Sequence, residues 1–217
     1  RKNRAVDCCR FHPQVVGQSD VPWSLMAQNS VLLRAVSHWR KDAEGWLSGS
    51  FDRLSETVRV NPLRADCDWT EGWLEGIGSQ RISWFSGPGS AWALPFNRGS
   101  AQGDVKEILK ALHGTGRLTR QEASSMLPVL ALGAKQGEVV LDMCASPGSK
   151  TTQIAEHMGE RGLVLANEVV NSRVNMLVTN IQRHGSRTVA VVHHDGRHIP
   201  RVPESGFDRI LVDAPCT

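Results

Sequence analysis

The sequence lacks the features that mark membrane, secreted and zinc-binding proteins. No stretch approaches the roughly 18 consecutive apolar residues of a membrane span, although 40% of the 217 residues are hydrophobic. A charged and apolar leader with a small-residue cleavage site is also missing, so we expect a cytoplasmic protein, nucleolar or nuclear if eukaryotic. The five cysteines form no Cys-x-x-Cys pair, which argues against a disulfide framework and against a zinc site.

Neither charge nor a phosphate-binding motif narrows the function further. The formal net charge is +3 and is spread evenly along the chain, which permits a nucleic-acid partner without requiring one. The dinucleotide fingerprint Gly-x-Gly-x-x-Gly and the Walker pattern are both absent. The function must therefore be sought in short segments at the ends of predicted strands.

The second half of the chain alternates short apolar strands with helical patterns. We expect strands near 138–142, 162–166, 188–192 and 208–213, and helices near 149–158 and 172–184. This alternation predicts right-handed βαβ units and a parallel, doubly wound α/β sheet. Earlier in the chain we expect an amphipathic helix over 27–47, a strand at 57–60, only short strands within 66–100, and helices that open with capping boxes at Asp104 and Thr119.

All seven tryptophans precede residue 97. We interpret them as the small core of the N-terminal part. The alternative is that one or two aromatic side chains, such as Trp84 or Phe85, stack on a nucleic-acid base.

A turn of small residues leads from the first predicted strand into a helix. Residues 141–152 read LDMCASPGSKTT, and the turn itself is Ala145-Ser146-Pro147-Gly148-Ser149-Lys150. Ligands of doubly wound sheets lie at the carboxyl ends of the strands, and the free N–H groups of a helix N-terminus favour an anion. We interpret that anion as the carboxylate of a methionine moiety in a small nucleotide-like cofactor. The alternative is an ordinary tight turn.

Two further acids follow the second and third predicted strands. Glu168 stands where a carboxylate accepts both hydroxyls of a ribose, and the alternative is a solvated loop residue. Asp195 stands where it could accept a hydrogen bond from an adenine amino group. The histidines around it match no common ligand spacing, so we predict no metal site.

The segment Asp213-Ala214-Pro215-Cys216 ends the fourth predicted strand. Carbon-5 of cytosine becomes nucleophilic only after a thiolate adds at carbon-6, and the ring nitrogen must be hydrogen-bonded or protonated as charge builds. A carboxylate beside a thiol suits that chemistry, so we predict Asp213 and Cys216 as catalytic residues of a methyltransferase that acts on a pyrimidine. A buried structural thiol is the alternative for Cys216.

Several segments, taken in order and spacing, resemble the Sun-type RNA cytosine-5 methyltransferases, which include the bacterial ribosomal RNA enzymes of types B and F. The matching segments are Arg59–Arg64, Gln121–Pro128, Leu141–Thr152, Leu165–Glu168, His194–Arg197 and Asp213–Cys216. Two residues depart from the pattern: Pro62 replaces the usual Thr, and Ser146 replaces the usual Ala.

The resemblance implies a Rossmann-like domain that binds S-adenosyl-L-methionine behind a small RNA-recognition-like domain. We therefore expect an N-terminal extension and helix over 1–50, a small α+β domain over 51–116, and a C-terminally truncated Rossmann-like domain over 117–217. Cys144 to Lys150, Glu168, Asp195 and Asp213 would bind the cofactor. Cys216 would assist product release, and the attacking cysteine is expected in a later loop beyond Thr217.

The predicted function is formation of 5-methylcytosine in rRNA or tRNA by a monomer that needs neither metal nor membrane. Three alternatives remain: a DNA cytosine methyltransferase in which Cys216 attacks the base, an amino-group methyltransferase, and a non-catalytic RNA-binding or assembly factor with the same fold. Trapping on 5-fluorocytosine in RNA or in DNA would separate the two cytosine enzymes.

Overall fold

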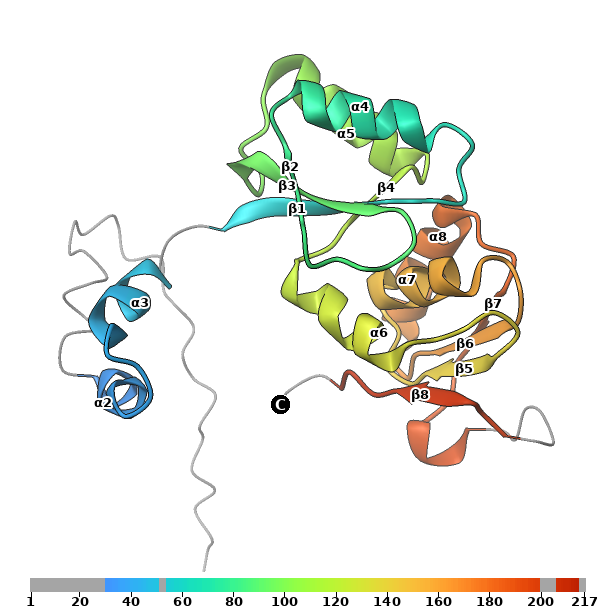
Figure 1. Ribbon diagram of the computed structural model, residues 1–217. Helices are drawn as coiled ribbons and strands as arrows, with labels where there is room; N and C mark the ends of the chain where they lie inside the picture. Colours follow the sequence, from blue (N-terminus) through green and yellow to red (C-terminus); the bar gives the residue numbers. More distant parts are fainter. Residues whose placement is uncertain (1–29, 51–53, 200–205, 215–217) are drawn as a thin grey trace, which may run out of the picture. The chain divides into compact units, whose positions relative to one another are not determined.

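The computed structural model describes residues 30–50, 54–199 and 206–214 (Figure 1). The chain divides into two units, residues 1–54 and 55–216. The first unit contains helices α2 (Val31–Ser37) and α3 (Ala43–Gly49). The expectation of a single helix over 27–47 is therefore wrong for residues 30–47, which form two helices with a turn between them. Helix α2 ends at Ser37, and an ion pair of 2.8 Å between Arg40 and Asp42 lies in the turn that precedes α3.

The second unit begins with a four-stranded antiparallel sheet in the order β2-β3-β1-β4. Helices α4 and α5 pack on one of its faces around a core that includes Val58, Leu74, Trp92 and Leu109 (Figure 1). The elements are β1 (Ser55–Val60), α4 (Cys67–Gly76), β2 (Gln80–Arg81), β3 (Ser90–Asn97), α5 (Gly103–Gly114) and β4 (Leu118–Arg120).

Several expectations for this region are wrong. Residues 66–100 contain a ten-residue helix and an eight-residue strand rather than short strands alone. Asp104 does not cap α5, which begins at Gly103 after Gln102. Thr119 does not open a helix either, because it pairs with Arg59 as part of β4, and this strand continues the sheet beyond the expected boundary at residue 116.

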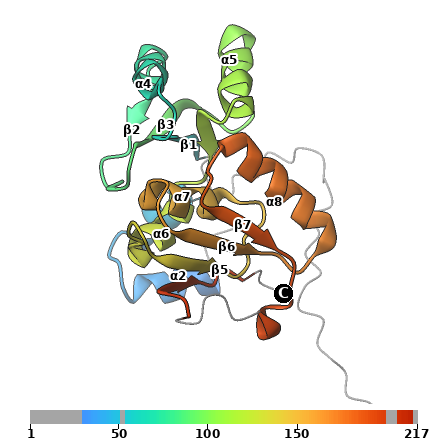
Figure 2. The same ribbon diagram turned by 90° about the vertical axis from the view of Figure 1, so that its right-hand side faces the viewer.

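A parallel sheet in the order β7-β6-β5-β8 follows. Its strands and its helices α7 and α8 confirm the predicted elements close to their predicted bounds. Helices α7 and α8 lie on the face of this sheet that is turned toward the first sheet (Figures 1 and 2). The elements are η1 (Ser124–Met126), α6 (Leu127–Leu132), β5 (Val139–Asp142), α7 (Ser149–Met158), β6 (Leu163–Asn167), α8 (Asn171–His184), β7 (Val189–Val192), η2 (Gly196–His198) and β8 (Arg209–Leu211).

The tryptophans only partly form the core that we expected. Trp92 is buried and Trp73 packs partly against the core of the first sheet, whereas Trp39, Trp69 and Trp84 are exposed. None of the described helices is both long and apolar enough to span a membrane.

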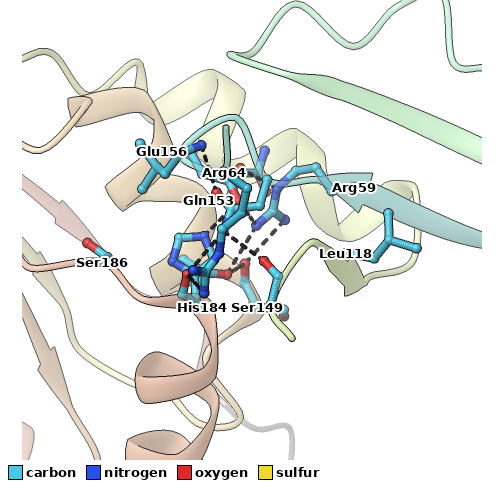
Figure 3. A network of polar contacts seen from close by, with 12 residues as sticks. Arg59, Arg64, Leu118, Ser149, Gln153, Glu156, His184 and Ser186 are labelled. Carbon is cyan, nitrogen blue, oxygen red and sulfur yellow. Dashed lines mark hydrogen bonds and ion pairs between the residues drawn. The ribbon is translucent and has the colours of Figure 1, made fainter. Parts of the chain in front are cut away.

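A buried polar network joins the two sheets (Figure 3). The guanidinium of Arg59 in β1 reaches α7, where its Nε lies 2.6 Å from Oε2 of Glu156 and its Nη2 lies 3.0 Å from Oε1. The same carboxylate is 3.0 Å from Nε2 of His184, and Arg59 also donates to Gln121. Burial opposes the ionisation of Glu156, but Arg59 and His184 outweigh burial and hold the pKa of this carboxyl below its usual range.

The loop that follows β1 donates hydrogen bonds to backbone carbonyls at the end of α8. Asn61 Nδ2 donates to the carbonyl oxygens of Gly116 at 2.9 Å and His184 at 3.1 Å, and Arg64 Nη2 donates to Arg183 O at 2.9 Å. The last carbonyls of a helix have no partner within the helix. Side chains of the first sheet therefore supply these partners and fix α8 against it.

Candidate active site

The carboxyl ends of β5, β6, β7 and β8 lie along one edge of the parallel sheet. Strand β8 is the neighbour of β5, with Asp142 opposite Leu211, while β6 and β7 extend from the other side of β5. The sheet order therefore reverses between β5 and β8, and such a switch point is where doubly wound folds bind their ligands. The ends of the first and fourth predicted strands therefore lie side by side.

Asn167, the last residue of β6, holds the loop after β5 and the loop after β7 together. Its Nδ2 donates to Met143 O and to His194 O, each at 3.0 Å, and its Oδ1 accepts from His194 N at 3.0 Å. The loop after β7 also approaches the loop after β5 directly, because a Cβ built on Gly196 would lie 3.1 Å from Sδ of Met143. The loop after β5 and the loop after β7 are thus fixed on either side of β6.

The turn after β5 is anchored to α8. Ser146 is buried, its Oγ donates to Arg173 O at 3.1 Å, and Arg173 Nη2 donates to Ser146 O at 2.7 Å. Asn180 Nδ2 donates to Pro147 O at 2.6 Å. Gly148 has a φ of 106°, which glycine adopts without strain, and α7 starts after it without a side-chain cap. The backbone N–H groups of the first turn of α7 are therefore left for a ligand.

Asp142 and Cys144 are close to this turn and are both perturbed by burial. Burial raises the pKa of Asp142 to about 6, although Thr151 Oγ1 donates to its Oδ2 at 2.7 Å. Burial also raises the pKa of the Cys144 thiol, and the charges of Asp142 and Glu168 add to this effect. A thiol with a raised pKa carries little thiolate at neutral pH, so Cys144 does not suit the role of a nucleophile.

Glu168 lies directly after β6 and is buried. Its Oε1 accepts from Val170 N at 2.8 Å, and its Oε2 lies 3.6 Å from Nε of Arg173. Asp195 lies after β7 and caps η2 through Arg197 N at 3.0 Å. The hydrogen bonds from Arg197 hold the pKa of Asp195 well below its usual range. Both acids thus lie along one edge of the sheet, where Asp195 is an ionised acceptor at neutral pH.

Asp213 follows β8 and reaches the turn after β5. Its Oδ2 lies 2.7 Å from Nζ of Lys150, the second residue of α7, and its side chain is 53% exposed. The carboxylate thus lies beside the loop from which we expected the cofactor to be held. Cys216 lies outside the described residues. Within those residues no group of three or more His, Cys, Asp or Glu side chains is arranged to hold a metal ion.

Three residues that the sequence analysis did not assign to the site belong to its framework. These are Asp142, Asn167 and Arg173. Asp142 and Asn167 end their strands, so their places at the edge of the sheet could have been anticipated. No sequence pattern indicates a role for Arg173 at the site, because only the tertiary structure brings the start of α8 against Ser146.

Comparison with known proteins agrees with this arrangement. Residues 129–217 match the family model described as 16S rRNA methyltransferase RsmB/F. The tRNA (cytosine(49)-C(5))-methyltransferase of Pyrococcus abyssi is 34% identical over 177 residues, which are 81% of this chain and 54% of that protein. The ribosomal RNA small subunit methyltransferase F of an Enterobacter species is 54% identical over 109 residues, which are 49% of this chain and 23% of that protein.

A solved structure has the same fold. A methyltransferase homolog protein from Pyrococcus horikoshii superposes with a TM-score of 0.67 at 29% identity, over 93% of this chain and 64% of that chain. The chain spans about half of the archaeal tRNA enzyme and about a quarter of the ribosomal RNA enzyme. The Rossmann-like sheet and the loops at its carboxyl edge are thus similar to those of the Sun-type, RsmB/F methyltransferases.

Proposed function

We propose that the protein transfers a methyl group from S-adenosyl-L-methionine to carbon-5 of a cytosine in rRNA or tRNA. The observation that carries the proposal is the ion pair between Asp213 and Lys150. It places the carboxylate at the end of β8 beside the turn that begins α7. The methyl donor and the base are expected to meet over this carboxylate.

The residues present suit this cofactor. The uncapped N–H groups of α7 suit the carboxylate of its methionine end, within the stretch from Cys144 to Lys150. Glu168 suits the ribose hydroxyls and Asp195 suits the adenine amino group, since carboxylate oxygens accept hydrogen bonds. When bound, S-adenosyl-L-methionine supplies an electrophilic methyl group on its sulfonium.

The chain's own residues would act on the base. Asp213 would hydrogen-bond the pyrimidine while a thiolate adds at carbon-6 and the electron pair moves toward carbon-5. After methylation the carbon-5 proton leaves as the sulfur–carbon bond breaks, and Cys216 would assist this release. The expected boundary between residues 116 and 117 would cut β4 from its sheet, so we propose residues 51–120 as the RNA-recognition-like part and residues 121–217 as the methyltransferase part. The monomeric state and the cellular location stay predictions.

The test is methyl transfer from labelled S-adenosyl-L-methionine to RNA by the protein at its natural length. Asp213→Ala should abolish transfer, because the base then loses its acceptor, whereas Asp104→Ala on the exposed start of α5 should leave the rate unchanged. Wild-type turnover by Asp213→Ala would refute the placement of this residue at the base.

A second variant separates attack from release. Cys216→Ala should form the covalent bond to the base but fail to break it, so an RNA–protein adduct should accumulate on a denaturing gel. Adduct formation with 5-fluorocytosine in RNA and not in DNA would favour the RNA enzyme over its DNA counterpart. RNA binding with no transfer by the wild type would favour the non-catalytic alternative.

A further inference from the structure

A cavity of about 350 Å³ lies between the first sheet and the helices of the parallel sheet. Residues of the first sheet with its helices and residues of α8 line this cavity. Arg98 follows β3, His113 belongs to α5 and Arg120 ends β4. Asn180 and Arg183 belong to α8. Figure 2 shows the end of α8 lying below α5. The volume is within the range of about 300–1,000 Å³ found for small-ligand sites.

The cavity is positively charged. Three arginines and two histidines line it, and none of its lining residues is Asp or Glu. Arg120 is paired with Glu56 at 3.1 Å, but among the described residues neither Arg98 nor Arg183 forms an ion pair. Burial lowers the pKa of Arg183, and burial together with the charge of Arg183 lowers that of His113. An anion in the cavity would give Arg98 and Arg183 the counter-charge that neither has among the described residues.

The cavity continues into the loop of the candidate active site. Pro147, Gly148 and Ser149 line it, and they are also the end of the turn from β5 into α7. Asn180 links the cavity to the turn after β5, because it lines the cavity and its Nδ2 donates to Pro147 O at 2.6 Å. An anion bound here would therefore lie next to the turn proposed to bind the cofactor, on a surface shared by the two sheets.

We propose that this cavity binds the phosphodiester backbone of the RNA strand that carries the target base, a role that rests on the proposed function. Guanidinium groups recognise phosphate oxygens by paired hydrogen bonds. Contacts to the backbone position a strand without reading its sequence. Arg98 and Arg183 thus position the strand, while the selection of the base occurs at Asp213.

The test is the affinity for a fluorescently labelled single-stranded oligoribonucleotide, measured over a salt series without cofactor. Arg98→Gln and Arg183→Gln should each weaken binding about three- to tenfold, and each should lower the slope of log affinity against log salt by about 1. The matched control is Arg161→Gln, an exposed arginine in the turn between α7 and β6 that does not line the cavity. It should leave the affinity and the slope close to wild type.

Two outcomes would overturn the proposal. Lining variants that match Arg161→Gln in both affinity and slope would show that the cavity binds no phosphate. Competition by polyglutamate as strong as that by RNA of equal charge would show a site for acidic protein segments instead.

Two further measurements keep this test independent of the reaction. Binding of S-adenosyl-L-methionine and the thermal unfolding midpoint should be unchanged in both variants, so that loss of RNA binding cannot be misfolding. Wild-type protein that binds RNA through these arginines but transfers no methyl group would contradict the proposed function and leave the site in place. Methyl transfer with unaltered RNA binding by the variants would contradict the site alone.

Discussion

Replacing Glu156 by glutamine should be among the most destabilising single changes in the chain. The side chains of Arg59 and Glu156 are 0% and 1% exposed and 2.6 Å apart. Glu156→Gln keeps the shape of the side chain but leaves the guanidinium of Arg59 buried without a counter-charge. Loss of one partner of a buried pair costs about 3–5 kcal/mol, a large part of the roughly 5–15 kcal/mol by which a domain is stable.

Urea unfolding measures this loss. With a denaturant dependence of about 2 kcal/mol per molar, the midpoint should fall by about 1.5–2.5 M. The control is Glu107→Gln, which removes the exposed pair with Lys110 on α5 and should cost at most about 0.5 kcal/mol. A loss in Glu156→Gln no larger than in this control would refute the reasoning.

Two extensions separate a buried charge from a simple loss of packing. The double variant Arg59→Met, Glu156→Leu should recover much of the stability, because no charge is then left buried. Because the pKa of Glu156 is lowered in the folded state, its contribution is present at neutral pH and is lost as the pH falls through the folded-state pKa. The stability difference between wild type and Glu156→Gln should therefore shrink in acid.

Two further predictions concern the turn before β4 and the end of β5. Gly116→Ala should lower the thermal unfolding midpoint by more than Gly99→Ala. Both glycines have a positive φ, but only at residue 116 would an added Cβ collide with the backbone, at the carbonyl of Arg183. Equal losses would show that the turn can move away from α8. The folded-state pKa of Asp142, about 6, is raised, so wild type should lose about 2–3 kcal/mol relative to Asp142→Asn as the pH rises from about 4 to 6. Parallel pH profiles in urea unfolding would contradict that pKa.

The predicted elements of the parallel sheet were confirmed because each is specified locally. A short apolar run followed by a helical pattern that ends at a glycine, such as Gly185 after α8, fixes a strand and a helix by near neighbours alone. The same reasoning failed at Thr119. Its capping pattern is a local signal, but pairing with Arg59, sixty residues earlier, outweighs it.

The amino-acid sequence by itself determined which residues stand at the strand ends, because chain order and strand pattern alone place Asp142, Asn167, Glu168 and Asp213 there. Only the tertiary structure decided how these residues are held. Arg59 and Glu156 are far apart in the chain, as are Asp213 and Lys150, and no periodicity encodes which buried charge meets which partner. A net charge of +3 does not reveal the positive cavity either, since the cavity forms only where Arg98 after β3, Arg120 of β4 and Arg183 of α8 converge.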